Sequence, residues 1–366
     1  MFKSGGGIFG SLSGVMKKAL KHILFLVLFF GFPIACSTFE NDPYLRTLKL
    51  PVEDIQAEDS IVLDAYELFS PDAIAALAGQ WVALSSIQGE NNLLFVNPLL
   101  GGSFTSIKKG RGPCEMVRGG SLHRISAGSV LYYDYYDGVC VSLAVQESLA
   151  GFRATLDTIA HFDSERVRPV FLVFYNGRFL SGNSYDPEMW YAIYDDRGDI
   201  CSSISGLRYP VFRQISDELK TSIHLSSKYT IKPDGTRLCV ANVATPSISF
   251  SLLDGFSMSE YKRIECAPPD LQPGRDAFSP DHRSAFQSLV SDDHAVYFLY
   301  SGHRFQNDEA PVNACTHVIV YDWDGNPKRH FRLDKYVNSI DLESGNKLVA
   351  CSSFPSERVY YFNLPL

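Results

Sequence analysis

Short apolar runs separated by tight turns are the feature of this sequence that most restricts its fold. The runs span roughly four to eight residues and are rich in β-branched and aromatic side chains, which is typical of β-strands. They include residues 93–96, 130–133, 170–175, 190–194, 295–300, 318–321 and 359–362. Hairpin dipeptides lie at Asp137-Gly138, Asn176-Gly177, Asp234-Gly235, Asp254-Gly255 and Asp324-Gly325. Such dipeptides predict two-residue type I′ turns, so the chain is predicted to be all-β: a barrel, a sandwich pair or a propeller.

The length of the chain selects among these architectures. A sandwich domain takes roughly 100 residues, and no linker divides these 366 residues into several such domains. A propeller with roughly 40 to 55 residues per blade accommodates them as one unit. A faint internal repeat agrees, because residues 191–198 and 318–325 both read as a strand followed by Tyr-Asp, two residues and Gly. We expect a β-propeller, with six blades of four-stranded antiparallel sheet.

One segment carries the signals of a helix. Ser70 is a good N-cap, Pro71 suits the first helical position, Asp72 favours the helix dipole and Gly79 can end the helix. The sequence therefore predicts a helix between Ser70 and Gly79.

The N-terminal residues read as an export signal. Lys17, Lys18 and Lys21 precede the apolar stretch 23–31, and Ala35-Cys36 follows it. This layout is typical of a secretory signal and is too short for a membrane span of about 20 apolar residues. The small residue before Cys36 resembles the bacterial lipobox, in which the thiol receives the lipid before the new amine is acylated. An ordinary cleaved signal and a retained anchor are the alternatives.

These signals predict the domain organisation. Residues 1–35 form the lipoprotein signal peptide, with Met16 as an alternative start; residues 36–59 form an acidic tether leading into the domain; residues 60–366 form one propeller. Lipid on Cys36 then anchors the protein to the outer membrane in the cell envelope. The sequence leaves open whether the domain faces the periplasm or the cell surface.

Several segments resemble a known family. The stretch Lys109-Gly110-Arg111-Gly112-Pro113-Cys114-Glu115 is similar to the G-[RK]-G-P-x-E signature of six-bladed TolB-like propeller lipoproteins from Bacteroides-type bacteria. Residues 300–302 with 318–327 resemble the late-blade segment of that family, and residues 230–235 a common propeller element. Cys114 departs from the pattern, which usually has a second Gly there. The resemblance implies a six-bladed propeller at the envelope and implies no agreed activity.

The same loop is the sharpest candidate site in the sequence, with Gly110, Arg111, Gly112, Pro113 and Glu115 as its residues. The two glycines permit a close turn whose N–H groups form an anion nest, and Arg111 with Glu115 can orient a ligand. The alternative is structural: the glycines supply positive φ, Pro113 stiffens the exit and Arg111 pairs with Glu115. The structural reading is the stronger one.

Other chemistry leaves no clear trace. The formal net charge of −8 argues against a nucleic-acid partner. No nucleophile elbow, phosphate-binding loop or metal motif occurs, so we assign no catalytic residue, metal or cofactor. A propeller can still gather distant residues on its axis, and nine histidines are scattered along the chain. Cys140, Cys201, Cys239 and Cys351 lie in apolar runs and are expected to be buried.

Two expectations complete the analysis. The first is that the protein binds an unknown protein or glycan through its propeller while lipid on Cys36 holds it to the membrane. The alternative is an enzyme that acts on an extracellular polysaccharide or peptide at the central channel. The second concerns closure of the ring: the early strand at residues 61–63 should join the sheet of the C-terminal strand at residues 359–364.

Overall fold

The structure is a computed structural model of the whole chain. It describes residues 42–66, 68–88, 90–97, 102–112, 115–117, 120–134, 137–148, 151–162, 173–175, 177–182, 186–195, 197, 199–306, 308–343 and 346–365. Cys36 and the leader lie outside the described residues. Within these ranges, we find no helix that is both long and apolar enough to cross a membrane.

The chain divides into two units, Met1–Arg46 and Thr47–Leu366. The described residues of the first unit begin the short helix α2 (Pro43–Leu48). Oδ1 of Asp42 caps this helix by accepting hydrogen bonds from the amides of Tyr44 and Leu45, at 2.9 and 3.0 Å.

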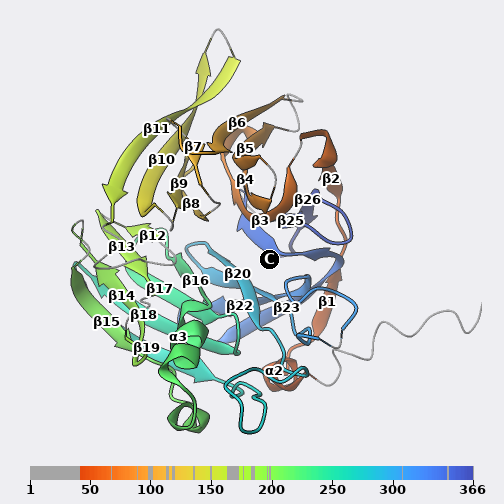
Figure 1. Cartoon of the computed structure of the whole chain (residues 1–366). Coiled ribbons are helices and arrows are strands. Elements are labelled where there is room, and N and C mark those ends of the chain that lie inside the picture. Colours follow the sequence, from red (N-terminus) through yellow and green to blue (C-terminus); the bar gives the residue numbers. More distant parts are fainter. Residues whose placement is uncertain are drawn as a thin grey trace, which may run out of the picture. The chain divides into compact units, whose positions relative to one another are not determined.

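The second unit is a six-bladed β-propeller, in which six sheets surround a common centre (Figure 1). Blade 1 contains β3 (Phe69–Ala76), β4 (Val82–Gln88), β5 (Asn91–Asn97), β6 (Gly102–Lys109) and β7 (Glu115–Met116). Blade 2 contains β8 (Ser121–Ser126), β9 (Ser129–Asp134), β10 (Val139–Ser148) and β11 (Gly151–His161). Blade 3 contains β12 (Val173–Tyr175), β13 (Arg178–Ser181), β14 (Met189–Tyr194) and β15 (Ile200–Ser205).

The remaining three blades complete the ring. Blade 4 contains β16 (Ser227–Ile231), β17 (Arg237–Asn242), β18 (Ser247–Asp254) and β19 (Ser257–Glu265). Blade 5 contains β20 (Phe286–Ser291), β21 (Ala295–Tyr300), β22 (Cys315–Asp322), β23 (Pro327–Val337) and β1 (Val52–Ile55). Blade 6 contains β24 (Ser339–Leu342), β25 (Lys347–Ser352), β26 (Arg358–Asn363) and β2 (Asp59–Val62). The predicted all-β, six-bladed architecture is confirmed.

Closure of the ring by the two ends of the domain is also confirmed. Strand β2 is antiparallel to β26, with Asp59 opposite Tyr361 and Val62 opposite Arg358. An early strand thus forms the outer edge of the last blade. Side chains of blades 6 and 1 then share one core, in which Val359 and Tyr361 pack with Ile74 and Leu94.

A second N-terminal strand, β1, lies within the segment expected to be a tether. It pairs in parallel with β23 and covers the outer edge of blade 5. Two ion pairs lie along this pairing: Arg329 donates to both oxygens of Glu53 at 2.9 Å, and Arg332 donates to Asp54 at 2.6 and 3.0 Å. The first strands of the domain therefore bind to two successive blades.

Strands in the middle of the blades are buried along their whole length because each sheet packs between two others. Every residue of β14 is buried, for example. Between blades 2 and 3, the rings of Phe162 and Phe179 meet edge to face with centroids 4.8 Å apart. This two-sided burial explains why the strands read as continuous apolar runs in the sequence.

The helix predicted between Ser70 and Gly79 is wrong. This segment forms β3 and a single 3₁₀ turn, η2 (Ala78–Gln80). N-capping signals contribute about 1 kcal/mol, whereas the strand places Ile74, Ala75 and Ala76 in the core. Burial between blades therefore outweighs the local helix signals.

The predicted turns occur, but those at Gly138, Gly235, Gly255 and Gly325 are not type I′. These glycines take positive φ, whereas Asp137, Asp234, Asp254 and Asp324 before them do not. Between β22 and β23, for instance, the amide of Gly325 donates to Asp322 O at 3.0 Å, and the amide of Asp322 donates to Asn326 O at 3.0 Å. At Gly325, a positive φ at glycine alone is typical of longer hairpin loops that end in a left-handed residue. At Gly255, where Asp254 pairs with Ser257 around two residues, it is typical of a type II′ turn.

The expectation for the cysteines is right in three cases and wrong in one. Cys140, Cys239 and Cys351 are buried, whereas Cys201 is exposed. Cys201 lies on the outermost strand of blade 3, where side chains face solvent on an unpaired edge.

Candidate functional site

Three titratable side chains come from the innermost strands of different blades. Asp72 lies on β3 of blade 1, His123 on β8 of blade 2 and Lys228 on β16 of blade 4. Each is partly buried, and its strand is the innermost of its sheet. We call Asp72, His123 and Lys228 the axial cluster.

The charge of Lys228 acts on both other members of the cluster. Burial raises the pKa of Asp72, and the hydrogen bond from Ser85 and the charge of Lys228 both oppose that rise. Blades 1 and 4 lie opposite each other in a ring of six, so this interaction crosses the axis. Burial lowers the pKa of Lys228, against the charge of Asp72. Burial also lowers the pKa of His123 to about 4, and Lys228 adds to this effect, which leaves the imidazole neutral at pH 7.

A β-bulge directs Asp72 toward this position. Pro71 pairs with Ser86 and Ala73 pairs with Ser85, so Asp72 is the extra residue between two consecutive partners. Ser70, two residues earlier, has φ of 49°, a conformation that costs energy for residues other than glycine. Oγ of Ser85 donates to Asp72 Oδ1 at 2.6 Å and fixes the carboxyl group. Bulges and strained residues of this kind are often found at functional sites.

A second bulge lies at the same level of the ring. On β20 of blade 5, Phe286 pairs with Tyr300 and Ser288 with Leu299, which leaves Gln287 as the extra residue. Its Nε2 donates to Ser284 Oγ at 2.6 Å. Two contacts through blade 6 place the bulges at the same level. Asn338, which precedes β24, donates a hydrogen bond to Pro71 O beside the first bulge. Ser339 Oγ on β24 lies 3.4 Å from Ser288 Oγ beside the second bulge.

Uncharged hydroxyl groups join the innermost strands beside the cluster. Oγ1 of Thr230 and Oγ of Ser291 lie 2.8 Å apart and connect blade 4 to blade 5. Ser288 Oγ also accepts from the amide of Ile340 at 3.2 Å, which connects blade 5 to blade 6. Neutral hydroxyl groups therefore connect the innermost strands of blades 4, 5 and 6.

Sequence reasoning missed most of this site. Lys228 was not singled out, Asp72 was taken for a helix residue, and His123 was one of nine scattered histidines. The available signal was a charged residue inside a short strand-like run, as in residues 227–231, which lead into the Asp234-Gly235 turn. Only the ring brings such residues together.

The predicted loop motif lies elsewhere, between β6 and β7 at the outer edge of blade 1. There Glu115 Oε2 accepts from the amide of Gly112 at 2.8 Å, and the amide of Glu115 donates to Gly112 O at 3.0 Å. A Cβ at Gly110 would lie 1.9 Å from Glu115 Oε2, so a larger residue there would displace the Glu115 side chain. Arg111 is exposed, and Pro113 lies outside the described residues. The loop brings Gly110, Gly112 and Glu115 together, away from the axial cluster.

Comparison with known proteins identifies the family. Residues 103–345 match the sequence model of the TolB-like 6-blade propeller-like family. The chain belongs to this family. The search of curated proteins finds no match to this TolB-like propeller.

Solved structures match this TolB-like propeller over most of its length. The calcium-binding protein regucalcin from Agrobacterium tumefaciens is 13% identical, with a TM-score of 0.51, and the match covers 86% of this chain and 95% of regucalcin. A member of the DUF4221 family from Bacteroides vulgatus is 10% identical, with a TM-score of 0.49, covering 84% and 97% of the two chains.

Histidines of the TolB-like propeller do not assemble a metal centre within the described residues, where no group of three or more potential ligands occurs. They pair instead. His317 Nδ1 lies 2.8 Å from His330 Nε2 across β22 and β23, and His303 Nδ1 lies 3.1 Å from Asp308 Oδ2 in the loop before β22. Burial lowers the pKa of each of these histidines, and the pKa of His330 falls to about 4.

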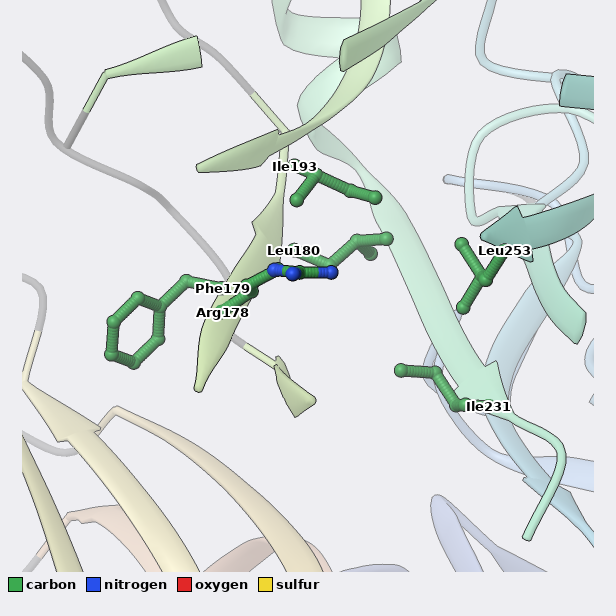
Figure 2. A pocket seen from close by; sticks show the side chains of 6 residues that line it. All are labelled: Arg178, Phe179, Leu180, Ile193, Ile231 and Leu253. Atoms are coloured by element: carbon green, nitrogen blue, oxygen red, sulfur yellow. The ribbon is translucent and has the colours of Figure 1, made fainter. Parts of the chain in front are cut away.

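A small pocket of the TolB-like propeller lies between blades 3 and 4 (Figure 2). Its empty volume is ≈ 190 Å³, part of which is open to solvent. Its lining is apolar apart from one guanidinium: Arg178, Phe179, Leu180, Ile193, Ile231 and Leu253. Sites for small molecules take about 300–1,000 Å³, so this space is a gap between blades and not a ligand site.

Proposed function

We propose that this TolB-like propeller is a lipid-anchored envelope protein that binds a small polar ligand at the axial cluster. One observation carries the proposal: Asp72 and Lys228 lie on the innermost strands of blades 1 and 4, and burial disfavours the charge of each. Proteins seldom retain such groups without use, and perturbed ionisable groups gather at functional sites. The rigid ring holds them in place for a ligand.

Binding at the axis is tested by thermal unfolding of the full-length protein in detergent. The compounds are neutral sugars, amino acids, short peptides, organic acids and nucleotides. A ligand at 100 times its Kd stabilises by about 2.7 kcal/mol, which raises Tm by about 3–5 °C for a domain of this size. We expect at least one class to raise the Tm of the wild type but not that of Lys228→Met.

Lys232→Met is the matched control for this screen. Lys232 lies one residue beyond the same strand and pairs with Asp234 in the turn. The control should respond like the wild type. Equal responses from Lys228→Met and Lys232→Met would place the ligand away from the axis and contradict the proposal.

The anchor is tested separately through Cys36. Cys36→Ala removes the thiol that accepts the lipid, so the protein should move almost completely from the detergent phase to the aqueous phase in Triton X-114 partitioning. A single acyl chain gives only marginal membrane binding, whereas several chains give stable anchoring. Ser37→Ala serves as the control and should leave partitioning unchanged. If Cys36→Ala stays in the detergent phase, the lipoprotein assignment fails.

An enzyme acting on an extracellular polysaccharide or peptide at the axis is the second candidate. It is favoured by the combination of a carboxyl group with raised pKa and a neutral imidazole in one cluster, which suits general acid–base chemistry. Release of reducing ends or amines from envelope polymers by the wild type, with loss of release in Asp72→Asn, would favour this candidate.

A further inference from the structure

Strand β1 is held to blade 5 by few contacts. Its four residues pair in parallel with β23, and their side chains alternate between exposed and partly buried. Both ion pairs along this pairing are open to solvent, and in one of them Arg332 and Asp54 expose 45% and 66% of their side chains. Ion pairs exposed to this degree add little stability. Strand β1 can therefore separate from β23 while the rest of the blade stays folded.

A buried pair of imidazoles lies on the strands next to β1. His317 Nδ1 on β22 is 2.8 Å from His330 Nε2 on β23, and the two residues expose only 4% and 3% of their surface. The register places Val52 of β1 directly beside His330. One of the two ring nitrogens carries the shared hydrogen and the other accepts it. A first added proton puts a charge into this buried pair, and a second leaves two donors facing each other.

The surroundings of the pair oppose added protons. Burial lowers the pKa of His317 to about 3, with smaller effects in the same direction from the charges of His330, Arg332 and His303, while Asp54 opposes the shift. Burial also lowers the pKa of His330 to about 4, and the charge of Arg332 adds to this effect. Both rings are therefore neutral at pH 7 while they stay buried.

The titratable and charged groups around the pair come from four elements. They are Glu53 and Asp54 on β1, Tyr300 on β21, Arg329 and Arg332 on β23, and His303 with its partner Asp308 in the loop before β22.

Acid weakens this attachment through the histidines. When β1 opens and water reaches the pair, the pKa of each imidazole returns toward its ordinary value near 6.5. The open state then binds protons that the closed state excludes. Opening therefore becomes more favourable as the pH falls from about 6.5 toward 4, by up to about tenfold per pH unit for each hydrated imidazole.

The carboxylates of β1 respond in the same direction, at lower pH. The hydrogen bond from Arg329 lowers the pKa of Glu53. The hydrogen bond from Arg332 likewise lowers the pKa of Asp54. The attraction of each ion pair is thus present at neutral pH and is lost as the pH falls through these lowered values.

We propose that β1 is an acid-sensitive edge strand, which covers blade 5 at neutral pH and separates from β23 when the His317–His330 pair takes up protons. The ring stays closed, because β2 and not β1 pairs with the last strand β26. This inference goes beyond the proposed function. In a protein anchored through Cys36, release of β1 adds the seven residues 52–58 to the connection between the lipid and the ring, about 23–25 Å when extended.

Hydrogen exchange followed by mass spectrometry on the full-length protein in detergent tests this inference. Overlapping peptides report on residues 53–57 of β1 and its exit and on residues 59–62 of β2. After correction for the pH dependence of intrinsic exchange, protection of β1 should fall at least tenfold between pH 7 and pH 5, while that of β2 changes less than twofold. A fall of less than threefold in β1, or an equal fall in both strands, would overturn the inference.

Substitutions assign the response to the histidine pair. His330→Gln places an amide group near the position of Nε2, and His317→Asn places one near Nδ1, so each variant keeps a polar group there that does not titrate. Each should reduce the loss of β1 protection between pH 7 and pH 5 at least threefold, and the double variant should reduce it to less than twofold. Tm at pH 7 shows which variants fold, and either single variant suffices for the test.

His224→Gln is the matched control. His224 lies in α3 (Asp217–Leu225), is 1% exposed, and accepts a hydrogen bond from the amide of Leu207 at 3.0 Å. Burial lowers its pKa to about 4, as it does for His330. The control should lose β1 protection in acid like the wild type. An equal loss in the wild type and in the double variant would mean that the histidine pair does not control β1, and would overturn the inference.

Discussion

Removing the last strand should destabilise the whole propeller and not merely fray one end. Strand β26 lies between β25 and β2, so deleting residues 359–366 leaves two unpaired edges and opens the ring. The deletion also removes Val359, Tyr361 and Phe362, which are buried in the cores of blade 6. At about 1.5–3 kcal/mol for each side chain, the loss approaches the 5–15 kcal/mol total stability of a typical protein.

Thermal unfolding followed by circular dichroism measures this effect. We expect the truncated protein to lose its cooperative transition or to melt at least about 7 °C lower, in keeping with a loss of several kcal/mol. Removing only residues 365–366, beyond the last strand, is the control and should change little. A cooperative transition within a degree or two of the intact protein would show that β26 is an accessory to the ring.

Asp341 should have a large effect at the same closure between blades 6 and 1. Its Oδ2 accepts from the amide of Ala76 on β3 at 2.8 Å, and its Oδ1 accepts from the amide of Leu342 at 2.8 Å. Arg124 of blade 2 approaches Oδ1 at 3.4 Å and donates to Leu342 O at 2.6 Å. One carboxylate thus connects three blades. Burial nevertheless raises the pKa of Asp341, so the ion pair does not fully compensate for the lost hydration.

Asp341→Ala should therefore lower the free energy of unfolding by about 3 kcal/mol, because it leaves the Ala76 amide without its acceptor and a cation without its carboxylate. Urea unfolding gives this value. Asp157→Ala, at an exposed position on the outer strand β11, is the control and should change stability by less than about 0.5 kcal/mol. A similar small change in Asp341→Ala would mean that the three-blade contact adds nothing to closure.

The elements of this protein that rest on local chemistry could be predicted from the sequence. Strands such as 190–194 and 318–321 could be recognised in the sequence because strands that are buried on both faces consist of unbroken apolar runs. Glycines at 235 and 325 marked hairpins because they accept positive φ, although the full turn geometry depends on the number of loop residues. The pairing of residues 61–63 with the C-terminal strand followed from the need of a ring to leave no open edge.

Other features were decided only by the tertiary structure. The segment from Ser70 to Gly79 has the local signals of a helix, and only its packing between blades 6 and 1 makes it a strand. The axial cluster draws Asp72, His123 and Lys228 from segments far apart in the sequence. Their proximity cannot be predicted from their spacing along the chain. It depends on which blades face each other and on a bulge that shifts Asp72 out of register. Local sequence determines the strands and turns of this propeller, whereas the closed ring determines which side chains meet at its axis.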